Sequence, residues 1–257
     1  MYDINCKFFC YFLGFFWGDG SVKQTAQINV VYIDGIELRS IFKKCLSFSS
    51  RKWIPKNKDG CNRQDQMFFS KFDKPLNKFL KDNGFENKSI DSPSKILKII
   101  PNNLHRYFWR GFYDADGCFY KRKDGKGGKI QISGTYEQDW SDLEKLLYSL
   151  NIQDYSIERK KYKSKSSVLV VRYGPSLITL GDYLYSGSCF GLKRKYDKFL
   201  EIKNSLPKIT SKHKGISLCG RTKKWRAFHK RKYLGYFAEE SKAIEALEEY
   251  KSNLNLP

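Results

Sequence analysis

Histidine is scarce in this sequence and cysteine is scattered. Only three His residues occur among 257 residues. The seven Cys residues are irregularly spaced, and no Cys-x-x-Cys pair is present. The small number of His residues and the lack of a Cys-x-x-Cys pair argue against a structural zinc site. An odd number of irregularly spaced Cys residues argues against a disulfide framework. We therefore expect reduced, mostly buried thiols in a cytosolic compartment.

Long apolar runs are also missing. No segment reaches about eighteen uninterrupted apolar residues, so we expect no membrane span. The stretch KFFCYFLGFFWGDG near the N-terminus is short, is interrupted by Gly, and ends in Asp-Gly where a signal peptide would carry small residues. We expect no signal peptide. Aromatic residues make up 16% of the chain, which favours a buried core over disorder.

Acidic residues are few compared with basic ones. Forty-eight Lys and Arg residues stand against twenty-seven Asp and Glu residues, which gives a formal charge of +21. The excess runs along the whole chain rather than forming a tail. A basic balance of this size favours a polyanionic partner, most commonly nucleic acid. A soluble protein that is merely rich in Lys is the alternative that composition leaves open.

Two stretches of the chain resemble each other. YFLGFFWGDGSV and YFWRGFYDADGCF each indicate an aromatic-rich helix followed by Asp-Gly. When Gly20 is aligned with Gly117, each stretch is followed by a hairpin pattern, an amphipathic helix, a second strand pair, another helix and a short basic stretch. The sequence predicts an α+β fold of two pseudo-symmetric αββαββα repeats, over residues 1–103 and 104–206.

Each repeat places a carboxylate at an unfavourable position. Asp19 and Asp116 come last in their helices, where the helix dipole already concentrates negative charge. A single Asp-Gly is most simply a cap or a turn. Two of them at equivalent places, each after a helix with an internal glycine (Gly14, Gly111), favour a functional role.

The internal glycines suggest how these carboxylates could meet. Helices that pack side by side at Gly14 and Gly111 would bring Asp19 and Asp116 together at one end. Close carboxylates repel, so a divalent cation is the natural compensation. Donors that are all oxygen favour Mg²⁺, and paired ions can activate water and stabilise the leaving oxygen in phosphodiester hydrolysis.

The last fifty residues have a different pattern. Residues 207–214 are predicted to form a linker, and residues 215–257 contain three short strand-like runs followed by an amphipathic helix. Ten Lys or Arg residues and no acid lie between Lys208 and Lys232. A small sheet with one basic face and a covering helix can read the major groove of DNA.

The motifs LGFFWGDG and WRGFYDADG resemble those of the LAGLIDADG homing endonucleases in their single-chain, two-motif form. The resemblance covers about residues 8 to 205, and the first motif has Trp17 where the family has its earlier Asp. It implies a saddle of two antiparallel sheets on the DNA major groove, with the motif helices as the central interface. It also implies a monomer that needs no protein partner, and a double-strand cut across the minor groove that leaves 3′ overhangs.

The resemblance implies site residues as well. It assigns two or three Mg²⁺ ions to Asp19 and Asp116, and we add Gly18 and Ala115, which precede them. Basic residues near the scissile phosphates would be Lys88 and either Lys193 or Lys195, unless these lysines only neutralise phosphate or face solvent. Further candidates for DNA contacts on the strands and hairpins are Lys23, Gln27, Lys121, Arg122, Gln131, Arg159, Lys161 and Lys163.

The C-terminal stretch is similar to the plant ethylene-response-factor (AP-two type) DNA-binding domain. The similarity lies in Gly-Ile-Ser, Trp-Arg-Ala, Leu-Gly-x-Phe and the alanine-containing helix. It implies DNA contacts from Arg221, Lys223, Lys224, Trp225 and Arg226. Trp225 could instead belong to the core beneath the helix, where Leu234, Phe237, Ala243, Ile244 and Leu247 are expected.

Together these patterns predict a Mg²⁺-dependent, site-specific endonuclease for double-stranded DNA, encoded by a mobile intron or intein-like element in a phage or microbe or in an organelle. The alternatives from another class are an intron RNA maturase and a non-cleaving DNA-binding regulator. In a third alternative only the C-terminal stretch binds DNA.

Overall fold

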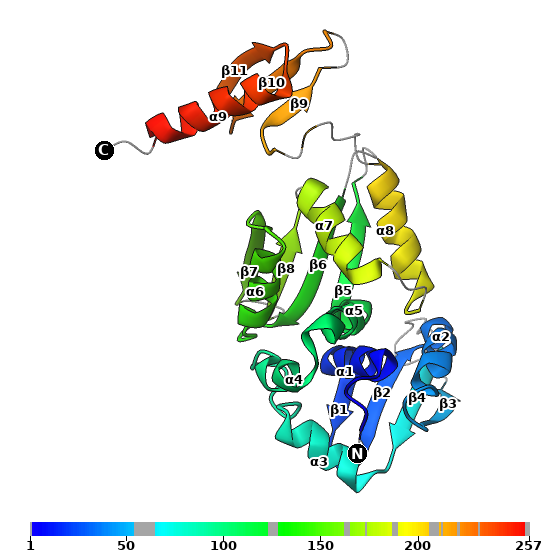
Figure 1. The fold of residues 1–257 in the computed structure, drawn as a ribbon. Helices are drawn as coiled ribbons and strands as arrows, with labels where there is room; N and C mark the ends of the chain where they lie inside the picture. The colour runs from blue at the N-terminus through cyan, green and yellow to red at the C-terminus, as the bar shows by residue number, and fades with distance from the viewer. Residues whose placement is uncertain are drawn as a thin grey trace. The chain divides into compact units, whose positions relative to one another are not determined.

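The computed structural model describes residues 2–53, 65–122, 128–161, 165–172, 174–186, 190–205, 211, 213–219, 222–230 and 232–254. The chain divides into two compact units, Met1–Ser205 and Leu206–Pro257 (Figure 1). None of the described helices is long and apolar enough to cross a membrane.

The first unit contains two sheets of the same topology. The first half is built from α1 (Lys7–Asp19), β1 (Gly20–Val22), β2 (Ala26–Val31), α2 (Tyr32–Phe42), β3 (Ser49–Trp53), β4 (Gln66–Lys71) and α3 (Lys74–Asp82). The second half is built from α5 (His105–Asp116), β5 (Gly117–Lys121), β6 (Gly128–Thr135), α6 (Ser141–Ser149), β7 (Tyr155–Lys160), β8 (Ser166–Val171) and α7 (Gly174–Tyr185). The antiparallel sheets have the orders β1-β2-β4-β3 and β5-β6-β8-β7. The predicted α+β class is confirmed.

Helices occur where the sequence pattern indicated only short connecting stretches. α4 (Ser94–Ile99) and a 3₁₀ turn (Asn102–Leu104) join the halves, and α8 (Lys193–Ser205) follows α7. α8 begins inside the basic LKRK stretch, which was expected to be a short tail of the repeat. Phe199 and Ile202 on α8 and Ile96 on α4 are buried, because their spacing gives each helix an apolar side.

The two motif helices α1 and α5 pack against each other with their backbones in close contact (Figure 1). A Cβ atom added at Gly14 would overlap the carbonyl oxygen of Phe108, and one added at Gly111 would overlap the carbonyl oxygen of Tyr11. This confirms the expected role of the two glycines. α1 is buried along most of its length, from Phe9 to Trp17, as an interface between two halves requires.

The strands alternate between a buried and an open face. Ile28 on β2 and Ile130 and Ile132 on β6 are almost fully buried against the helices. Gln27 and Gln131 lie between such residues and therefore face the opposite side of their sheets. In the part of the chain that the structure describes, polar side chains on this second face of each sheet remain available to a partner.

The second unit is a three-stranded antiparallel sheet with one helix. β9 (Ile216–Leu218), β10 (Trp225–His229) and β11 (Lys232–Phe237) pair in the order β11-β10-β9, and α9 (Glu240–Leu254) follows. Its buried residues are Ile216, Ala227, Ala243 and Leu247, with Trp225, Leu234, Phe237 and Ile244 packed against them. Trp225 therefore lies on the core side of the sheet. This agrees with the interpretation that Trp225 belongs to the core beneath the helix.

Alanine at Gly14 or Gly111 is expected to destabilise the protein by about 2 kcal/mol or more, because the added methyl group meets backbone that cannot move aside. In an isolated helix the same change would stabilise by about 1 kcal/mol. The sign of the change in the free energy of unfolding, measured with urea, therefore tests the close packing. Lys98→Ala, an exposed change on α4, serves as the control and should shift stability by less than about 0.5 kcal/mol.

Candidate metal and nucleic-acid site

Asp19 and Asp116 end the two motif helices, and the tight packing of α1 on α5 brings them to the same end of the pair. A Cβ atom added at Gly18 would lie 2.9 Å from Oδ2 of Asp116. Gly20 and Gly117 follow directly and begin β1 and β5. Both carboxylates therefore sit where a motif helix passes into the first strand of its sheet.

The environment of these carboxylates disfavours their charge. Burial raises the pKa of Asp19 to about 6, and the negative charge of Asp116 adds to this, while Lys195 and Lys88 oppose it. Burial likewise raises the pKa of Asp116 against the effect of the same two lysines. Asp19 is nevertheless exposed to solvent. An incoming cation can therefore reach two carboxylates that are crowded by protein and by each other.

Two lysines bind the carbonyl oxygens at the ends of the motif helices. Lys88 Nζ donates to the carbonyl of Trp17 at 2.6 Å and also to that of Gly18. Lys195, 6% exposed, donates to the carbonyls of Tyr113 at 2.9 Å and Gly117 at 2.8 Å. A positive charge at a helix C-terminus offsets the dipole there. Burial lowers the pKa of both lysines. Nearby carboxylates act in the opposite direction: Asp116 and Asp19 raise the pKa of Lys88, and Asp114 and Asp19 raise the pKa of Lys195.

The structure separates the candidate lysines. Lys193 is exposed and its ammonium pairs with Asp197 on the same helix, so it lies outside the cluster that Lys88 and Lys195 form with the carboxylates. The carbonyl of Ala115 accepts from Lys195 at 3.2 Å, as that of Gly18 does from Lys88. These two carbonyl oxygens already serve the lysines, so the carboxylates remain the principal metal candidates.

Asp114 has a different role from Asp116, although both lie in the last turn of α5. Asp114 is 1% exposed and accepts hydrogen bonds from the hydroxyls of Tyr11 at 2.7 Å and Tyr185 at 2.9 Å, and from the N–H of Leu192 at 3.0 Å. It joins α1, α5, α7 and the segment that leads to Lys195. The first motif has Trp17 at the equivalent position and fills the space with an indole ring.

A cavity of about 300 Å³ adjoins this cluster. Asp116 and Lys88 reach its wall. The other residues that line it are Trp17, Gly18, Ser89, Phe112, Ser133, Gly134, Thr135 and Gln138. A cavity that contains an ammonium group and hydroxyl groups can hold a phosphate group next to a carboxylate that binds a metal ion.

The segments that carry Lys195 and Lys88 are each held by a side chain of the opposite repeat. Arg194 Nε donates to Oδ1 of the buried Asp34 on α2 at 2.6 Å, and its second nitrogen pairs with Oδ2. In the other direction, the hydroxyl of Ser94 donates to Asp142 on α6. Both bonds cross between the halves, so the position of Lys195 depends on α2 of the first repeat.

The remaining sequence candidates fall into two groups. Gln27 lies opposite Ser21, and Gln131 lies opposite Cys118, so the two glutamines occupy matching places beside the motif glycines. Lys23, Arg122 and Lys161 are exposed. Lys163 lies outside the described residues.

Two candidate DNA contacts are engaged elsewhere. Lys121 shares the helix-covered side of β5 with buried Phe119 and pairs with Glu201 on α8 at 3.0 Å. Arg159 donates to the carbonyl of Gln138 at 3.0 Å and to that of Tyr136. Both DNA contacts stay predictions, and these two cationic groups have intramolecular partners in the structure.

The outer face of the second unit carries aromatic rings beside one arginine. Arg226 lies opposite Tyr236, and Phe228 lies opposite Tyr233, on the side away from the core. The rings of Tyr233 and Tyr236 are 5.5 Å apart and both are exposed. Lys223 and Lys224 are exposed next to β10, and Arg221 lies outside the described residues. Sequence spacing does not predict this pairing of tyrosines, because a β-bulge between Ala227 and Phe228 puts them on one face.

The donor atoms suit a hard divalent cation. Among the described residues, no group of three or more His, Cys, Asp or Glu side chains is arranged to hold a metal. The set consists of two carboxylates with carbonyl oxygens nearby, and Mg²⁺ uses one or two protein carboxylates while keeping several waters. The mutual repulsion of Asp19 and Asp116 is what such an ion would relieve.

Comparison with known proteins identifies the second repeat. Residues 103–183 match the family model described as a LAGLIDADG-like domain, so this part of the chain contains such a domain. No curated protein matches the sequence significantly.

Solved structures were also compared. The LAGLIDADG meganuclease I-AabMI bound to uncleaved DNA is 17% identical, with 76% of this chain and 89% of that chain covered and a TM-score of 0.46. The homing endonuclease I-WcaI bound to its DNA recognition sequence is 18% identical, with 75% and 87% covered and a TM-score of 0.49. Full-length DUF199/WhiA from Thermatoga maritima is 13% identical, with 76% and 59% covered and a TM-score of 0.44.

The raised pKa of Asp19 predicts a pH-dependent effect of Asp19→Asn in metal-free buffer. A carboxyl whose folded pKa of about 6 exceeds its ordinary value of 3.8 contributes stability that is present at low pH and is lost as the pH rises through 6. Asp19→Asn should therefore melt at a higher temperature than the wild type at about pH 8, with the difference vanishing near pH 4. Asp197→Asn removes an exposed ion pair and should show no such gain.

The Asp34–Arg194 pair should contribute measurably to stability because Asp34 is buried and bound at both oxygens. Asp34→Asn is expected to lower the free energy of unfolding by about 1–2 kcal/mol. The exposed pair of Lys78 and Asp82 provides the comparison, and Asp82→Asn should change stability by less than about 0.5 kcal/mol. Equal effects in urea titrations would contradict an anchoring role for Asp34.

Proposed function

We propose that this protein is a Mg²⁺-dependent endonuclease that cuts both strands of duplex DNA at a specific site. The observation that carries the proposal is the pair of carboxylates, Asp19 and Asp116, at one end of the α1–α5 interface with Lys88 and Lys195 beside them. The match of residues 103–183 to a LAGLIDADG-like domain supports it, because that stretch includes Asp116.

Asp19 and Asp116 would hold the Mg²⁺. A bound Mg²⁺ supplies an activated water and neutralises charge on a phosphodiester during hydrolysis. The chain's own groups would position the substrate. The cavity beside Asp116 would receive a phosphate, and Lys88 and Lys195 would place positive charge beside it while they hold the ends of the motif helices. Gln27 and Gln131 would orient water at the two strands.

DNA binding would use the open faces of the two sheets. Asn29 and Arg51 in the first sheet and Lys129 and Gln131 in the second lie on the sides away from the helices. The formal charge of +21 favours a polyanion of this kind. The outer face of the second unit, with Arg226, Tyr233 and Tyr236, would add affinity as a linked accessory module.

The direct test is linearisation of plasmids that carry candidate insertion sites, with and without Mg²⁺. The wild type should linearise one plasmid only with Mg²⁺, and Asp116→Asn should lower the rate by about 100-fold or more while its DNA affinity in EDTA is unchanged. Asp197→Asn, which alters an exposed carboxylate on α8, serves as the control and should cut normally.

Cleavage that survives in both Asp19→Asn and Asp116→Asn would contradict the assignment. Tight binding without cleavage in any divalent metal would instead favour the non-cleaving alternatives. Preference for structured intron RNA over duplex DNA in competition would then identify a maturase, and preference for duplex DNA would identify a regulator.

A further inference from the structure

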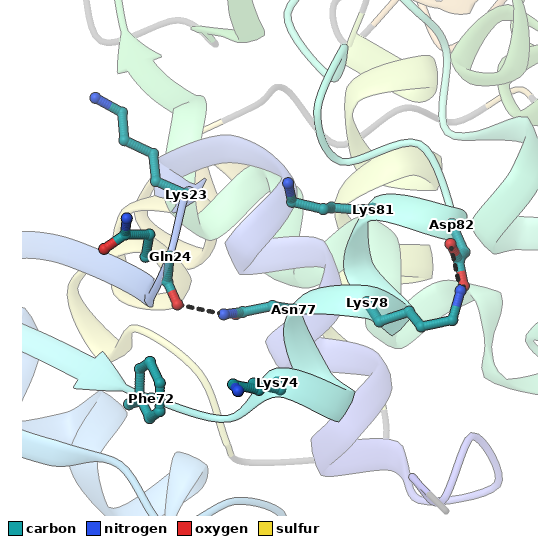
Figure 2. A pocket seen from close by; sticks show the side chains of 8 residues that line it. All are labelled: Lys23, Gln24, Phe72, Lys74, Asn77, Lys78, Lys81 and Asp82. Atoms are coloured by element: carbon teal, nitrogen blue, oxygen red, sulfur yellow. Dashed lines mark hydrogen bonds and ion pairs between the residues drawn. The ribbon is translucent and has the colours of Figure 1, made fainter.

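A basic groove lies between the β1–β2 turn and α3 (Figure 2). It shares no lining residue with the cavity beside the carboxylate cluster. It encloses about 560 Å³. Lys23 enters from the turn, and Lys74, Lys78 and Lys81 enter from the helix, while Phe72 stands at the start of the helix. Its lining thus combines four lysines and one aromatic ring with two amide residues and one carboxylate, that of Asp82.

Hydrogen bonds fix the two walls of this groove. The Asn77 side chain donates from Nδ2 to the carbonyl of Gln24 at 2.6 Å, which ties α3 to the turn, as Figure 2 shows. Asp73 caps α3 by accepting from the N–H of Leu76 at 3.0 Å. The groove is thus preformed, so a ligand does not have to order it first.

The charges of the groove are only partly compensated. Lys78 pairs with Asp82 at 2.9 Å, and Lys81 pairs with Glu86 at 2.8 Å. Within the described residues, Lys23 and Lys74 form no ion pair. Figure 2 shows the Lys23 side chain extending away from Lys74 and Phe72, so the two uncompensated ammonium groups lie at separate places along the groove. Such a pair favours an extended anion with more than one charge, such as a strand with several phosphates.

The lysines of α3 are not needed by the fold. α7 occupies the corresponding place in the second repeat, and its sequence GPSLITLGDYLY contains no Lys or Arg. Both helices bury their Leu residues in the same way, Leu76 and Leu80 on α3 and Leu177 and Leu180 on α7. The basic side of α3 is therefore an addition to the repeat.

Phe72 specifies the ligand further. Its side chain is 71% exposed, which is unfavourable for a large apolar ring in water. A nucleobase can stack on such a ring when its strand is unpaired, and phosphates then lie on neighbouring lysines. Bases in a duplex are stacked on each other and cannot use the ring in this way.

We infer that this groove binds a single-stranded segment of nucleic acid, with phosphates on Lys23 and Lys74 and a base on Phe72. β1 begins directly after Asp19 and ends at the turn that carries Lys23, so a strand leaving the carboxylates along β1 would reach the groove. This continuity rests on the proposed function, whereas binding in the groove does not.

The test measures fluorescence anisotropy of the full-length protein in EDTA, so that no cleavage occurs. The probes are a labelled single strand of about 20 nucleotides as DNA, the same sequence as RNA, and the DNA duplex. The variants are Lys23→Gln/Lys74→Gln and Phe72→Ala. Lys43→Gln/Lys98→Gln removes the same charge from two exposed lysines, one directly after α2 and one on α4, and is the matched control.

The groove variants should weaken binding of a single strand by about tenfold for the double lysine change and about fivefold for Phe72→Ala, with less than about twofold for the control. The slope of log affinity on log salt should fall by about 1.4 in the double variant, for two lost phosphate contacts. Duplex affinity should fall less than single-strand affinity in the double lysine variant, and Phe72→Ala should change duplex affinity no more than the control does. If the groove variants lose more affinity for the RNA strand than for the DNA strand, RNA is the natural ligand, and the reverse result identifies DNA.

Equal losses in the groove and control variants would overturn the inference, because they would reflect net charge alone. An equal loss for duplex and single strand would overturn it too. Phe72→Ala should melt at the wild-type temperature since the ring is exposed, so weaker binding by this variant cannot be ascribed to unfolding. Because EDTA abolishes metal chemistry in every sample, these outcomes are independent of the proposed cleavage.

Discussion

The contact of α1 with α5 through Gly14 and Gly111 is the constraint on which the rest of this structure depends. Each glycine faces a carbonyl oxygen of the opposite helix, so no larger residue fits at this separation. The close approach ends both helices together and thereby brings Asp19 next to Asp116. Two sheets then begin on either side of the same point. A single steric requirement thus positions the carboxylates, the strands and the cavity between them.

That arrangement concentrates negative charge, and the protein offsets it only in part. Lys88 and Lys195 satisfy carbonyl oxygens at the helix ends, and burial makes both the ammonium and the carboxylate charges unfavourable. Asp34 on α2 holds Arg194, the neighbour of Lys195, so a helix of the first repeat is linked to the lysine of the second. The remaining repulsion between the carboxylates provides the energetic reason for a divalent cation.

Residue patterns were sufficient to predict the repeat, the glycine contact and the matching places of Gln27 and Gln131, because each depends on local periodicity and steric fit. Partners chosen across the fold were not predictable. Lys121 and Arg159 look like free cations in the sequence, but each has an acceptor elsewhere in the fold. Tyr233 and Tyr236 are three residues apart and would lie on opposite faces of a regular strand. Only the bulge in the second unit places them together.

The most direct test of the account is to locate a divalent ion by anomalous X-ray scattering from crystals grown with Mn²⁺ in place of Mg²⁺. The account predicts a peak between the carboxylates of Asp19 and Asp116, and loss of this peak in Asp116→Asn crystals that otherwise keep the α1–α5 packing. An ion held only at other carboxylates, or no ion at this interface at saturating Mn²⁺, would contradict the claim that the paired motif helices form a metal site.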